Sequence, residues 1–363
     1  MLITNVCVFE NGRFRHGTIE TDGQRITRVF NENEPVPAGK RADGKGGYVF
    51  PAPIDLHIHG VNAFGAETGE LLEMSSALAE QGVGLFAPTF YSAPVEILCA
   101  QLKKCAALIG KETGARIRGV HLEGPFISPR KTGVMRAADT VAPSVAEMEK
   151  LYRAAGGHIF SLTIAPELDG SDEVITWCVQ HGILVQIGHT DATYAQTEHA
   201  KQLGAHHITH LGNAMRGFHH REPGALGAAL MDEDFSCEII ADGFHLSPEV
   251  IRFLHRIKPL DKIVLVTDAL RPTGQKVPPF FANGDEVMLK DGVWKRVQDG
   301  VTAGSALTML QAMKNLTGWG FTPAEAVVCA CVNPARLAGV DISALPLLLT
   351  DCHFSLVRSS DVD

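Results

Sequence analysis

The sequence predicts an α/β fold class: a (β/α)₈ TIM-like barrel with a small β-sandwich domain formed from both chain termini. Short apolar runs of strand length alternate eight times with helix-like stretches, which favours a parallel barrel over an open doubly wound sheet. Most runs are rich in Val, Ile, Leu or Phe, as expected for strands covered on both faces. The chain has 363 residues. A barrel needs roughly 250, so a second, smaller unit fits in the remainder.

The predicted elements alternate in chain order. The strand-like runs are 49–59, 84–90, 117–123, 160–166, 183–189, 206–210, 238–242 and 263–268. Helical patterns lie between them at 70–81, 94–111, 144–155, 172–181, 194–203 and 247–257. These six stretches are examples of the helical segments expected between parallel strands.

The two ends of the chain differ from its middle. Residues 1–50 contain short strand-like segments and turn-forming pairs such as Asn11-Gly12 and Gly46-Gly47, and residues 344–357 are again strand-like. We therefore assign residues 1–50 plus 341–363 to the small β-domain and residues 51–340 to the barrel. Residues 280–300 carry similar turn pairs, and we leave open whether they join the small domain as a β insertion.

Composition and charge argue against several classes of protein. The net charge is −9 and no basic tract is present, so we expect no nucleic-acid partner. No run of about 18 apolar residues suits a membrane span, and the N-terminal residues lack the pattern of a signal peptide. The eight cysteines are scattered without paired C-x-x-C spacing, which indicates reduced thiols in a cytoplasmic protein.

The residues that end the strand-like runs carry candidate chemistry. His57 and His59 end the first run, and both point to one side because successive strand residues alternate faces. Later runs end in four further candidates, namely Glu123, His189, His210 and Asp268. Barrel enzymes place their chemistry at these C-terminal strand ends. Imidazole and carboxylate suit zinc, iron and related divalent ions, and Glu123 is placed to lie between two of them.

Seven motifs follow one another in order along the chain. They are His57-Ile58-His59-Gly60, His121-Leu122-Glu123-Gly124-Pro125-Phe126, Gly188-His189-Thr190-Asp191-Ala192-Thr193, Thr209-His210-Leu211-Gly212-Asn213-Ala214-Met215, Arg221-Glu222-Pro223-Gly224, Ile240-Ala241-Asp242-Gly243-Phe244-His245 and Val266-Thr267-Asp268-Ala269. Together they resemble the motif series of the N-acetylglucosamine-6-phosphate deacetylases, which belong to the amidohydrolase superfamily. The resemblance runs from about residue 1 to 340.

The resemblance implies a metal-dependent amidohydrolase that converts N-acetylglucosamine 6-phosphate to glucosamine 6-phosphate and acetate in amino-sugar catabolism. It implies one or two divalent ions per subunit, with zinc preferred over iron or another transition metal. The implied metal ligands are His57, His59, Glu123, His189, His210 and Asp268, with the His57–His59 pair building a second metal site. A bound metal lowers the pKa of water to about 7, and Asp268 is the implied catalytic acid/base.

The resemblance also implies how the sugar phosphate is held. The implied substrate-binding residues are Asn213, Ala214, Arg221 and His245. The planar fork of Arg221 suits a phosphate, and His245 suits a developing oxyanion. Because members of this family often borrow the arginine from a neighbouring subunit, a homodimer is implied.

Three departures from the family pattern bear on specificity. Met135 stands where a histidine is usual, Arg271 follows Asp268 in place of a small residue, and the C-terminal stretch lacks the usual glycine-containing linker. Three alternatives stay open: a deacetylase of N-acetylgalactosamine 6-phosphate, another amidohydrolase acting on an N-acyl amino acid or cyclic amide, and a non-catalytic barrel. A non-catalytic barrel is expected to lose metal ligands or the acid/base, and this chain keeps all six residues.

Overall fold

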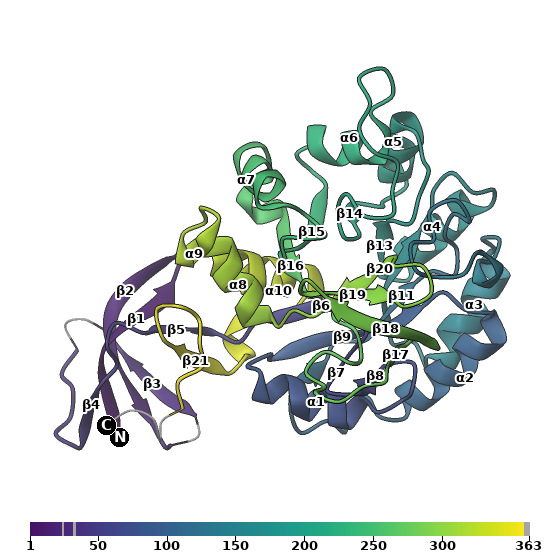
Figure 1. Cartoon of the computed structure of the whole chain (residues 1–363). Coiled ribbons are helices and arrows are strands. Elements are labelled where there is room, and N and C mark those ends of the chain that lie inside the picture. Colours follow the sequence, from purple (N-terminus) through teal and green to yellow (C-terminus); the bar gives the residue numbers. More distant parts are fainter. Residues whose placement is uncertain (24, 32–33, 359–363) are drawn as a thin grey trace.

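Eight parallel strands form the barrel at the centre of the molecule (Figure 1). The computed structural model describes residues 1–23, 25–31 and 34–358. In order around the barrel the strands are β6 (Ile54–Ile58), β9 (Leu85–Tyr91), β11 (Val120–Glu123), β12 (Ile159–Ile164), β13 (Leu184–Ile187), β14 (His207–Ile208), β15 (Ser236–Ile240) and β16 (Ile263–Val266). The short β10 (Arg116–Ile117) pairs with β9. The predicted fold class is confirmed.

The barrel closes where the chain leaves β16 beside β6. The Asp268 N–H donates to the His57 carbonyl at 2.9 Å, and the His59 N–H donates to the Ala269 carbonyl at 3.0 Å. These bonds bring the end of the eighth strand against the end of the first. Residues separated by more than 200 positions therefore meet at one mouth.

The first predicted strand is divided in the structure. Its leading part forms β5 (Tyr48–Pro51), which pairs with strands of the terminal sheet, and only β6 belongs to the barrel. The dipeptide Ala52-Pro53 separates the two strands. Proline cannot donate a ladder hydrogen bond, so the proline-rich junction is where the chain passes from one sheet to the next.

Helices lie around the barrel strands. They are α1 (Leu71–Glu80), α2 (Val95–Ala106), α3 (Val145–Ala154), α4 (Ser171–Gln180), α5 (Tyr194–Gln202), α6 (Gly224–Met231), α7 (Pro248–Ile257), α8 (Met309–Gly318), α9 (Pro323–Val327) and α10 (Asn333–Ala338), with a π-helical turn at Val328–Val332. The prediction included six of these and missed α6 and α8–α10. Among the described residues, no helix combines the length and the apolar character needed to cross a bilayer.

A separate sheet contains strands from both ends of the chain. Its order is β21 (Leu347–Thr350), β5, β1 (Leu2–Glu10), β2 (Arg13–Thr21) and β3 (Ile26–Phe30), and β4 (Arg41–Asp43) pairs with β1. Asn11 and Gly12 take positive φ values of 49° and 78° at the β1–β2 hairpin, as a two-residue turn of this kind requires. The exact division of the chain into domains stays a proposal, and residues 359–363 of the assigned range lie outside the described residues.

Residues 280–305 form a sheet of their own, distinct from the sheet that contains both ends of the chain. Its strands pair in the order β17 (Phe280–Ala282), β18 (Asp285–Lys290), β19 (Val293–Arg296) and β20 (Thr302–Ser305), and Ser305 also forms a parallel bridge with Ala269 at the end of the barrel. The sheet packs against the barrel: Trp294 is buried in a cluster that includes Tyr91 and Leu270 of the barrel, and its indole N–H donates to Thr273 Oγ1 at 3.0 Å. Residues Val301–Ala303 then contribute to the cavity at the barrel mouth.

Two short strands, β7 (Gly60–Val61) and β8 (Phe64–Gly65), follow β6 along the chain. They form a two-stranded hairpin that packs against Arg271, since a Cβ added at Gly60 or Gly65 would lie about 3 Å or less from Arg271 atoms. This close approach is possible because glycine has no side chain.

Candidate active site

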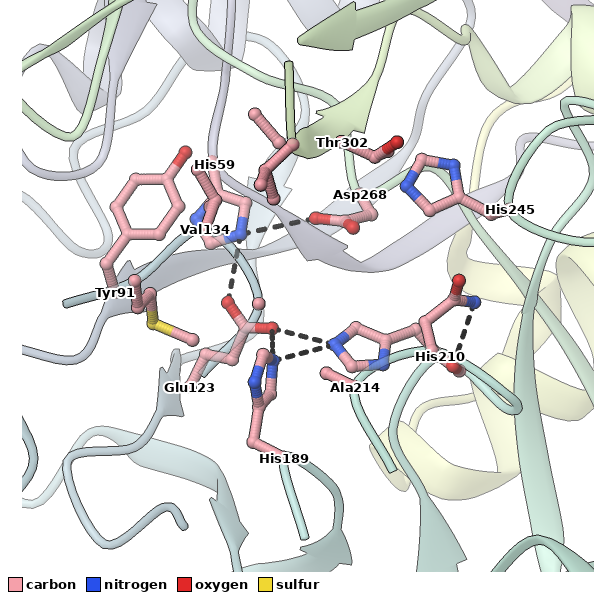
Figure 2. Close-up of a pocket in the computed structure, with 15 residues that line it drawn as sticks. His59, Tyr91, Glu123, Val134, His189, His210, Ala214, His245, Asp268 and Thr302 are labelled. Carbon is pink, nitrogen blue, oxygen red and sulfur yellow. Dashed lines mark hydrogen bonds and ion pairs between the residues drawn. The ribbon is translucent and has the colours of Figure 1, made fainter. Parts of the chain in front are cut away.

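A cavity of about 200 Å³ opens at the C-terminal ends of the barrel strands. Figure 2 shows that its lining side chains converge from separate strands. Six residues were predicted as metal ligands or as the acid/base. His57 lies in β6 and Glu123 ends β11, while the other four lie one or two residues after the end of a strand: His59, His189, His210 and Asp268. Five of them line the cavity: His59, Glu123, His189, His210 and Asp268. His57 lies directly behind them and is fully buried.

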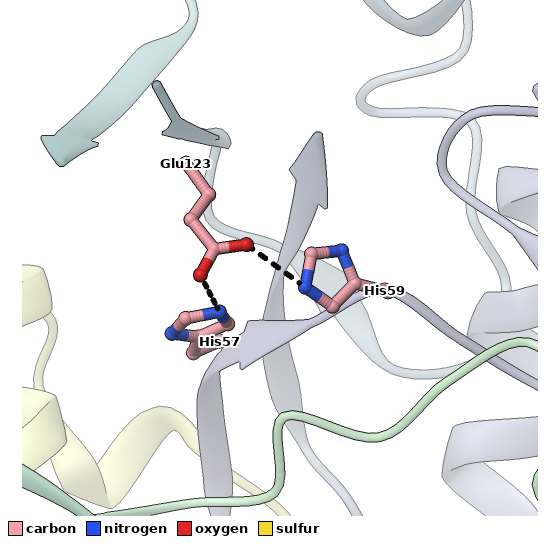
Figure 3. A group of neighbouring side chains, drawn as sticks. All are labelled: His57, His59 and Glu123. Carbon is pink, nitrogen blue, oxygen red and sulfur yellow. Dashed lines mark ion pairs between the residues drawn. The ribbon is translucent and has the colours of Figure 1, made fainter. Parts of the chain in front are cut away.

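The candidate ligands form two clusters that share Glu123. In the first cluster, Glu123 Oε1 lies 2.9 Å from His189 Nε2 and 3.0 Å from His210 Nε2, and these two nitrogens are 2.9 Å apart. In the second, Glu123 Oε2 lies 3.2 Å from His59 Nε2, and Oε1 lies 3.5 Å from His57 Nε2. Figure 3 shows the two oxygens facing the two histidines. One carboxylate thus faces four imidazoles.

The outer nitrogens of three imidazoles are held by fixed acceptors. His57 Nδ1 lies 2.9 Å from Glu238 Oε2, His59 Nδ1 lies 3.2 Å from the Thr89 carbonyl, and His189 Nδ1 lies 2.8 Å from the Lys131 carbonyl. With Nδ1 as the donor, Nε2 of each ring faces Glu123 and offers a lone pair whenever that ring is neutral. Lone pairs and carboxylate oxygens that converge in this way are suited to a divalent cation, so the residues fit the metal that the family implies.

The electrostatics of the site follow from the same geometry. Burial disfavours a charged His59, but its hydrogen bonds to Asp268 and Glu123 outweigh burial and raise the pKa of His59 to about 9. Burial also disfavours an ionised Glu123, yet the nearby His57 and His189 hold the pKa of this carboxyl well below its usual range. The site therefore keeps its carboxylates ionised and favours positive charge among them.

Asp268 lines the cavity beside the histidine pair of β6. Its Oδ1 lies 3.3 Å from His59 Nε2 and 3.6 Å from His57 Nε2. His245 stands beside it in Figure 2, and His245 Nδ1 lies 2.6 Å from Asp242 Oδ2. This bond orients the imidazole. Burial opposes a charged His245, but the bond to Asp242 prevails and raises the pKa of His245.

Several site residues have left-handed backbone conformations. The φ values are 47° for His189, 26° for His210, 44° for Ala214 and 50° for Asp268. Such conformations cost about 1–3 kcal/mol each for a residue other than glycine, and they persist only where the surroundings hold them. His189, His210 and Asp268 each turn the chain two residues after a strand ends, and Ala214 lies farther along the loop after β14.

The predicted substrate-binding residues are only partly assembled in one chain. Asn213, Ala214 and His245 line the cavity, and the Asn213 amide donates to the His210 carbonyl at 3.2 Å. Arg221 is exposed in the loop before α6 and does not line the cavity. Among the described residues, no lysine or arginine lines it. The assigned roles of these residues remain predictions.

The residues that depart from the family pattern lie in different places. Met135 is buried, lines the cavity and accepts the Ser92 N–H at its sulfur at 3.1 Å. Arg271 does not line the cavity, and its Nε donates to the Phe281 carbonyl at 3.3 Å. Arg296 links two parts of the cavity wall, because it lies beside residues 301–303 and donates to the Val134 carbonyl at 2.7 Å.

Sequence reasoning missed the residues that support the site. Tyr91 stacks flat on His59 with ring centroids 3.7 Å apart, Glu238 contacts His57, and Asp55 accepts the Thr267 hydroxyl at 2.5 Å. Asp55 had a signal, since it lies two residues before His57 and therefore shares its strand face. Glu238 begins a predicted strand, but nothing in the sequence pairs it with a particular histidine.

His121 lies two residues before Glu123 and therefore shares its strand face. It is fully buried, does not line the cavity, and lies between the hydroxyls of Thr89 and Thr163 at 3.2 and 2.8 Å. Its ring packs edge-on against His57, with centroids 4.6 Å apart. His121 therefore supports His57 from behind and does not face the cavity.

Comparisons with known proteins agree with this geometry. The model of the amidohydrolase family matches residues 48–345. An N-acetylglucosamine-6-phosphate deacetylase from Bacillus subtilis is 34% identical, covering 87% of this chain and 82% of the relative. An N-acetylgalactosamine-6-phosphate deacetylase from Escherichia coli O157:H7 is also 34% identical, covering 85% and 82%.

Solved structures give the same result. A mutant N-acetyl-D-glucosamine-6-phosphate deacetylase from Mycobacterium smegmatis, in complex with N-acetyl-D-glucosamine-6-phosphate, superposes with a TM-score of 0.89 at 28% identity, covering 100% of this chain and 98% of that one. The Thermotoga maritima deacetylase gives 0.85 at 30% identity, covering 100% and 99%. The chain therefore belongs to the amidohydrolase family, in the group of the N-acetylglucosamine-6-phosphate deacetylases.

Proposed function

We propose that this enzyme hydrolyses the acetamide of N-acetylglucosamine 6-phosphate, giving glucosamine 6-phosphate and acetate, as a step in amino-sugar catabolism. The observation that carries the proposal is the convergence of four histidines, Glu123 and Asp268 at one cavity in a chain of this family. The substrate class comes from the relatives and from the structure bound to N-acetyl-D-glucosamine-6-phosphate.

The residues proposed to hold the metal are the two clusters that share Glu123, so one or two ions per subunit fit, with zinc preferred for a set of imidazoles and carboxylates. When bound, a divalent cation supplies Lewis acidity, which polarises the amide carbonyl and makes water more acidic. Asp268 takes the proton from the attacking water at its carboxylate. It then delivers that proton to the nitrogen of the departing amine.

His245 completes the proposed chemistry. Its Nδ1–H donates to Asp242, and this bond raises the pKa of His245 against the opposing effect of burial, so the protonated ring is favoured. The protonated ring also carries a hydrogen on Nε2, which it can donate to the carbonyl oxygen as negative charge develops there. Asn213 and Ala214 lie in the cavity wall where the sugar would bind. Val134 and Met135 add apolar side chains to the same wall.

We propose that the phosphate is bound with the help of Arg221 from a second copy of the chain. Two observations support this: no cationic side chain of lysine or arginine lines the cavity among the described residues, and Arg221 lies exposed on a loop. A homodimer would then be the catalytic unit. A cytoplasmic location is also proposed, supported by eight cysteines that are all free thiols.

The test is acetate release by the metal-loaded protein from N-acetylglucosamine 6-phosphate, its 4-epimer and the unphosphorylated sugar. Fast release from the first substrate alone supports the proposal. Preference for the 4-epimer would favour the second candidate, the galactosamine-type deacetylase, which the equally similar Escherichia coli relative supports. Release from none, with metal bound, would overturn both and direct attention to other N-acyl substrates.

A further inference from the structure

Behind the metal-ligand candidates lies a buried carboxylate that the proposed reaction does not use. Glu238 belongs to β15, is fully buried and does not line the cavity. Its Oε2 lies 2.9 Å from His57 Nδ1 and accepts the backbone N–H of His210 at 3.1 Å. Its Oε1 lies 3.5 Å from His207 Nε2. One carboxylate thus contacts a residue from each of the two ligand clusters.

A carboxylate in this place is costly unless its partners are well arranged. Taking an ionised carboxylate out of water carries a penalty of several kcal/mol, which a hydrogen-bonded partner must offset. A neutral amide or hydroxyl would satisfy the same donors at lower cost. The carboxylate is therefore best explained by what it does to its partners.

The contact to His57 decides which nitrogen of that imidazole faces the cavity. A carboxylate accepts and does not donate, so Nδ1 of His57 carries the hydrogen and Nε2 presents its lone pair. His57 Nε2 is buried, has no hydrogen-bond partner, and lies 3.5 Å from Glu123 Oε1 and 3.6 Å from Asp268 Oδ1. Such an atom suits coordination to a cation.

The contact to His210 acts on the backbone. His210 has a φ of 26°, a conformation that needs support, and its N–H is directed onto the same Oε2 atom. His210 Nε2 then points to Glu123 in the first cluster, as Figure 2 shows. Through these two bonds, Glu238 couples the orientation of one ligand in each cluster.

We propose that Glu238 is a positioning residue that holds His57 in the Nδ1–H form and fixes His57 and His210 relative to each other, so that both ion sites around Glu123 keep their geometry. This inference rests on the proposed function, because it concerns the metal that the function requires. Buried carboxylates behind metal-ligating histidines have this effect generally, and their loss lowers metal affinity about 10- to 100-fold.

The test compares Glu238→Gln with Ser236→Ala. Glutamine has the size of glutamate, so the fold is expected to survive. It lacks the charge that favours a hydrogen on His57 Nδ1, and its amide can present either its oxygen or its NH2 group to that nitrogen, so the preference for the Nδ1–H form is lost. Ser236 lies on the same strand, and its hydroxyl contacts His207 Nδ1 at 2.6 Å, so its loss controls for disturbance of β15. The readouts are ions bound per chain, by elemental analysis, and zinc affinity, by competition with a chelator.

The expected result is a loss of zinc affinity of about tenfold or more in Glu238→Gln, with the melting temperature of the metal-free protein unchanged and Ser236→Ala within about threefold of wild type. A second measurement is independent of any variant. Nitrogen-15 NMR of the wild-type zinc protein with labelled histidine should show His57 protonated at Nδ1.

Two outcomes overturn the proposal. Equal zinc affinity in Glu238→Gln and wild type would show that Glu238 is only a structural partner of the histidines, and a His57 protonated at Nε2 would do the same. Failure of the proposed function is separate: in that case the wild-type protein itself binds no divalent ion, or binds it and releases no acetate.

Discussion

Replacing Asp268 by asparagine removes a charge and a proton acceptor while preserving shape. The backbone of Asp268 is held on both sides, since its N–H donates to the His57 carbonyl and its carbonyl accepts the Ser305 N–H, both at 2.9 Å. The side chain is nearly buried, with 7% of the residue exposed. Asparagine should therefore occupy the same position and leave an oxygen available to the metal site.

We expect Asp268→Asn to slow the reaction. A positioned general acid/base contributes about 10²–10⁴ to the rate, and each tenfold equals about 1.4 kcal/mol of barrier. We expect Asp268→Asn to lower kcat at least about a hundredfold, which is about 2.7 kcal/mol. The assay is acetate release from N-acetylglucosamine 6-phosphate at saturating substrate, with bound metal quantified in the same preparation.

The control is Asp172→Asn, an exposed carboxylate on α4 that pairs with His199 away from the cavity. It should leave kcat unchanged. A turnover of Asp268→Asn within about threefold of wild type, with metal bound, would refute its role as acid/base. Loss of metal together with activity would instead assign Asp268 to the ligand set alone.

Four further predictions concern binding and stability. Arg221→Ala should raise KM for the phosphorylated sugar and not for the unphosphorylated one, with the exposed Arg252→Ala as control; an equal effect on both sugars would count against a phosphate contact. Arg296→Ala breaks the bond to the Val134 carbonyl and should raise KM more than it lowers kcat, whereas an unchanged KM would mean that the two parts of the wall do not need this link. A chelator should abolish acetate release and lower the melting temperature, because bound metal stabilises only the folded state. Added zinc should restore both acetate release and the melting temperature, and no change in melting temperature would argue against a metal site in these clusters. Thr308→Ala removes the oxygen that accepts the Gln311 N–H at the start of α8 and should cost about 1 kcal/mol in urea unfolding, with KM unchanged.

The candidate ligands could be predicted from the sequence because of strand geometry. Alternation along β6 puts His57 and His59 on one side, and parallel strands put all their C-terminal ends at one mouth. Those two rules need no knowledge of tertiary contacts. They therefore identified Glu123, His189 and Asp268 from their places at strand ends, and the structure brings these residues together.

The exact ends of the strands and the residues that contact the metal-ligand candidates from behind could not be predicted in the same way. The division of run 49–59 between two sheets depends on which strands lie beside β5, and that partner, β21, comes from the far end of the chain. The contact of Glu238 with His57 also joins residues 181 positions apart. The local sequence pattern does not indicate such long-range pairings, because they depend on how the barrel closes.

Helix α6 was missed for a different reason. Its sequence, GALGAALM, has apolar or small residues on every side and two glycines, so it shows neither the periodicity of a surface helix nor good helix propensity. The structure buries it on most faces, as residues Gly224, Ala225, Gly227, Ala228 and Ala229 show. Tertiary packing, and not an intrinsic preference, therefore makes this segment helical.

The two departures near the mouth have different meanings once they are placed in the structure. Arg271 packs over the β7–β8 hairpin and donates to the Phe281 carbonyl, so its charge serves the contact between that hairpin and the 280–305 sheet. Met135 lines the cavity, and its sulfur accepts the backbone N–H of Ser92. A side chain without an acceptor at this place would leave that N–H unpaired. A change in substrate preference relative to other family members is therefore to be sought at Met135, because it is the departure that touches the space a substrate would occupy.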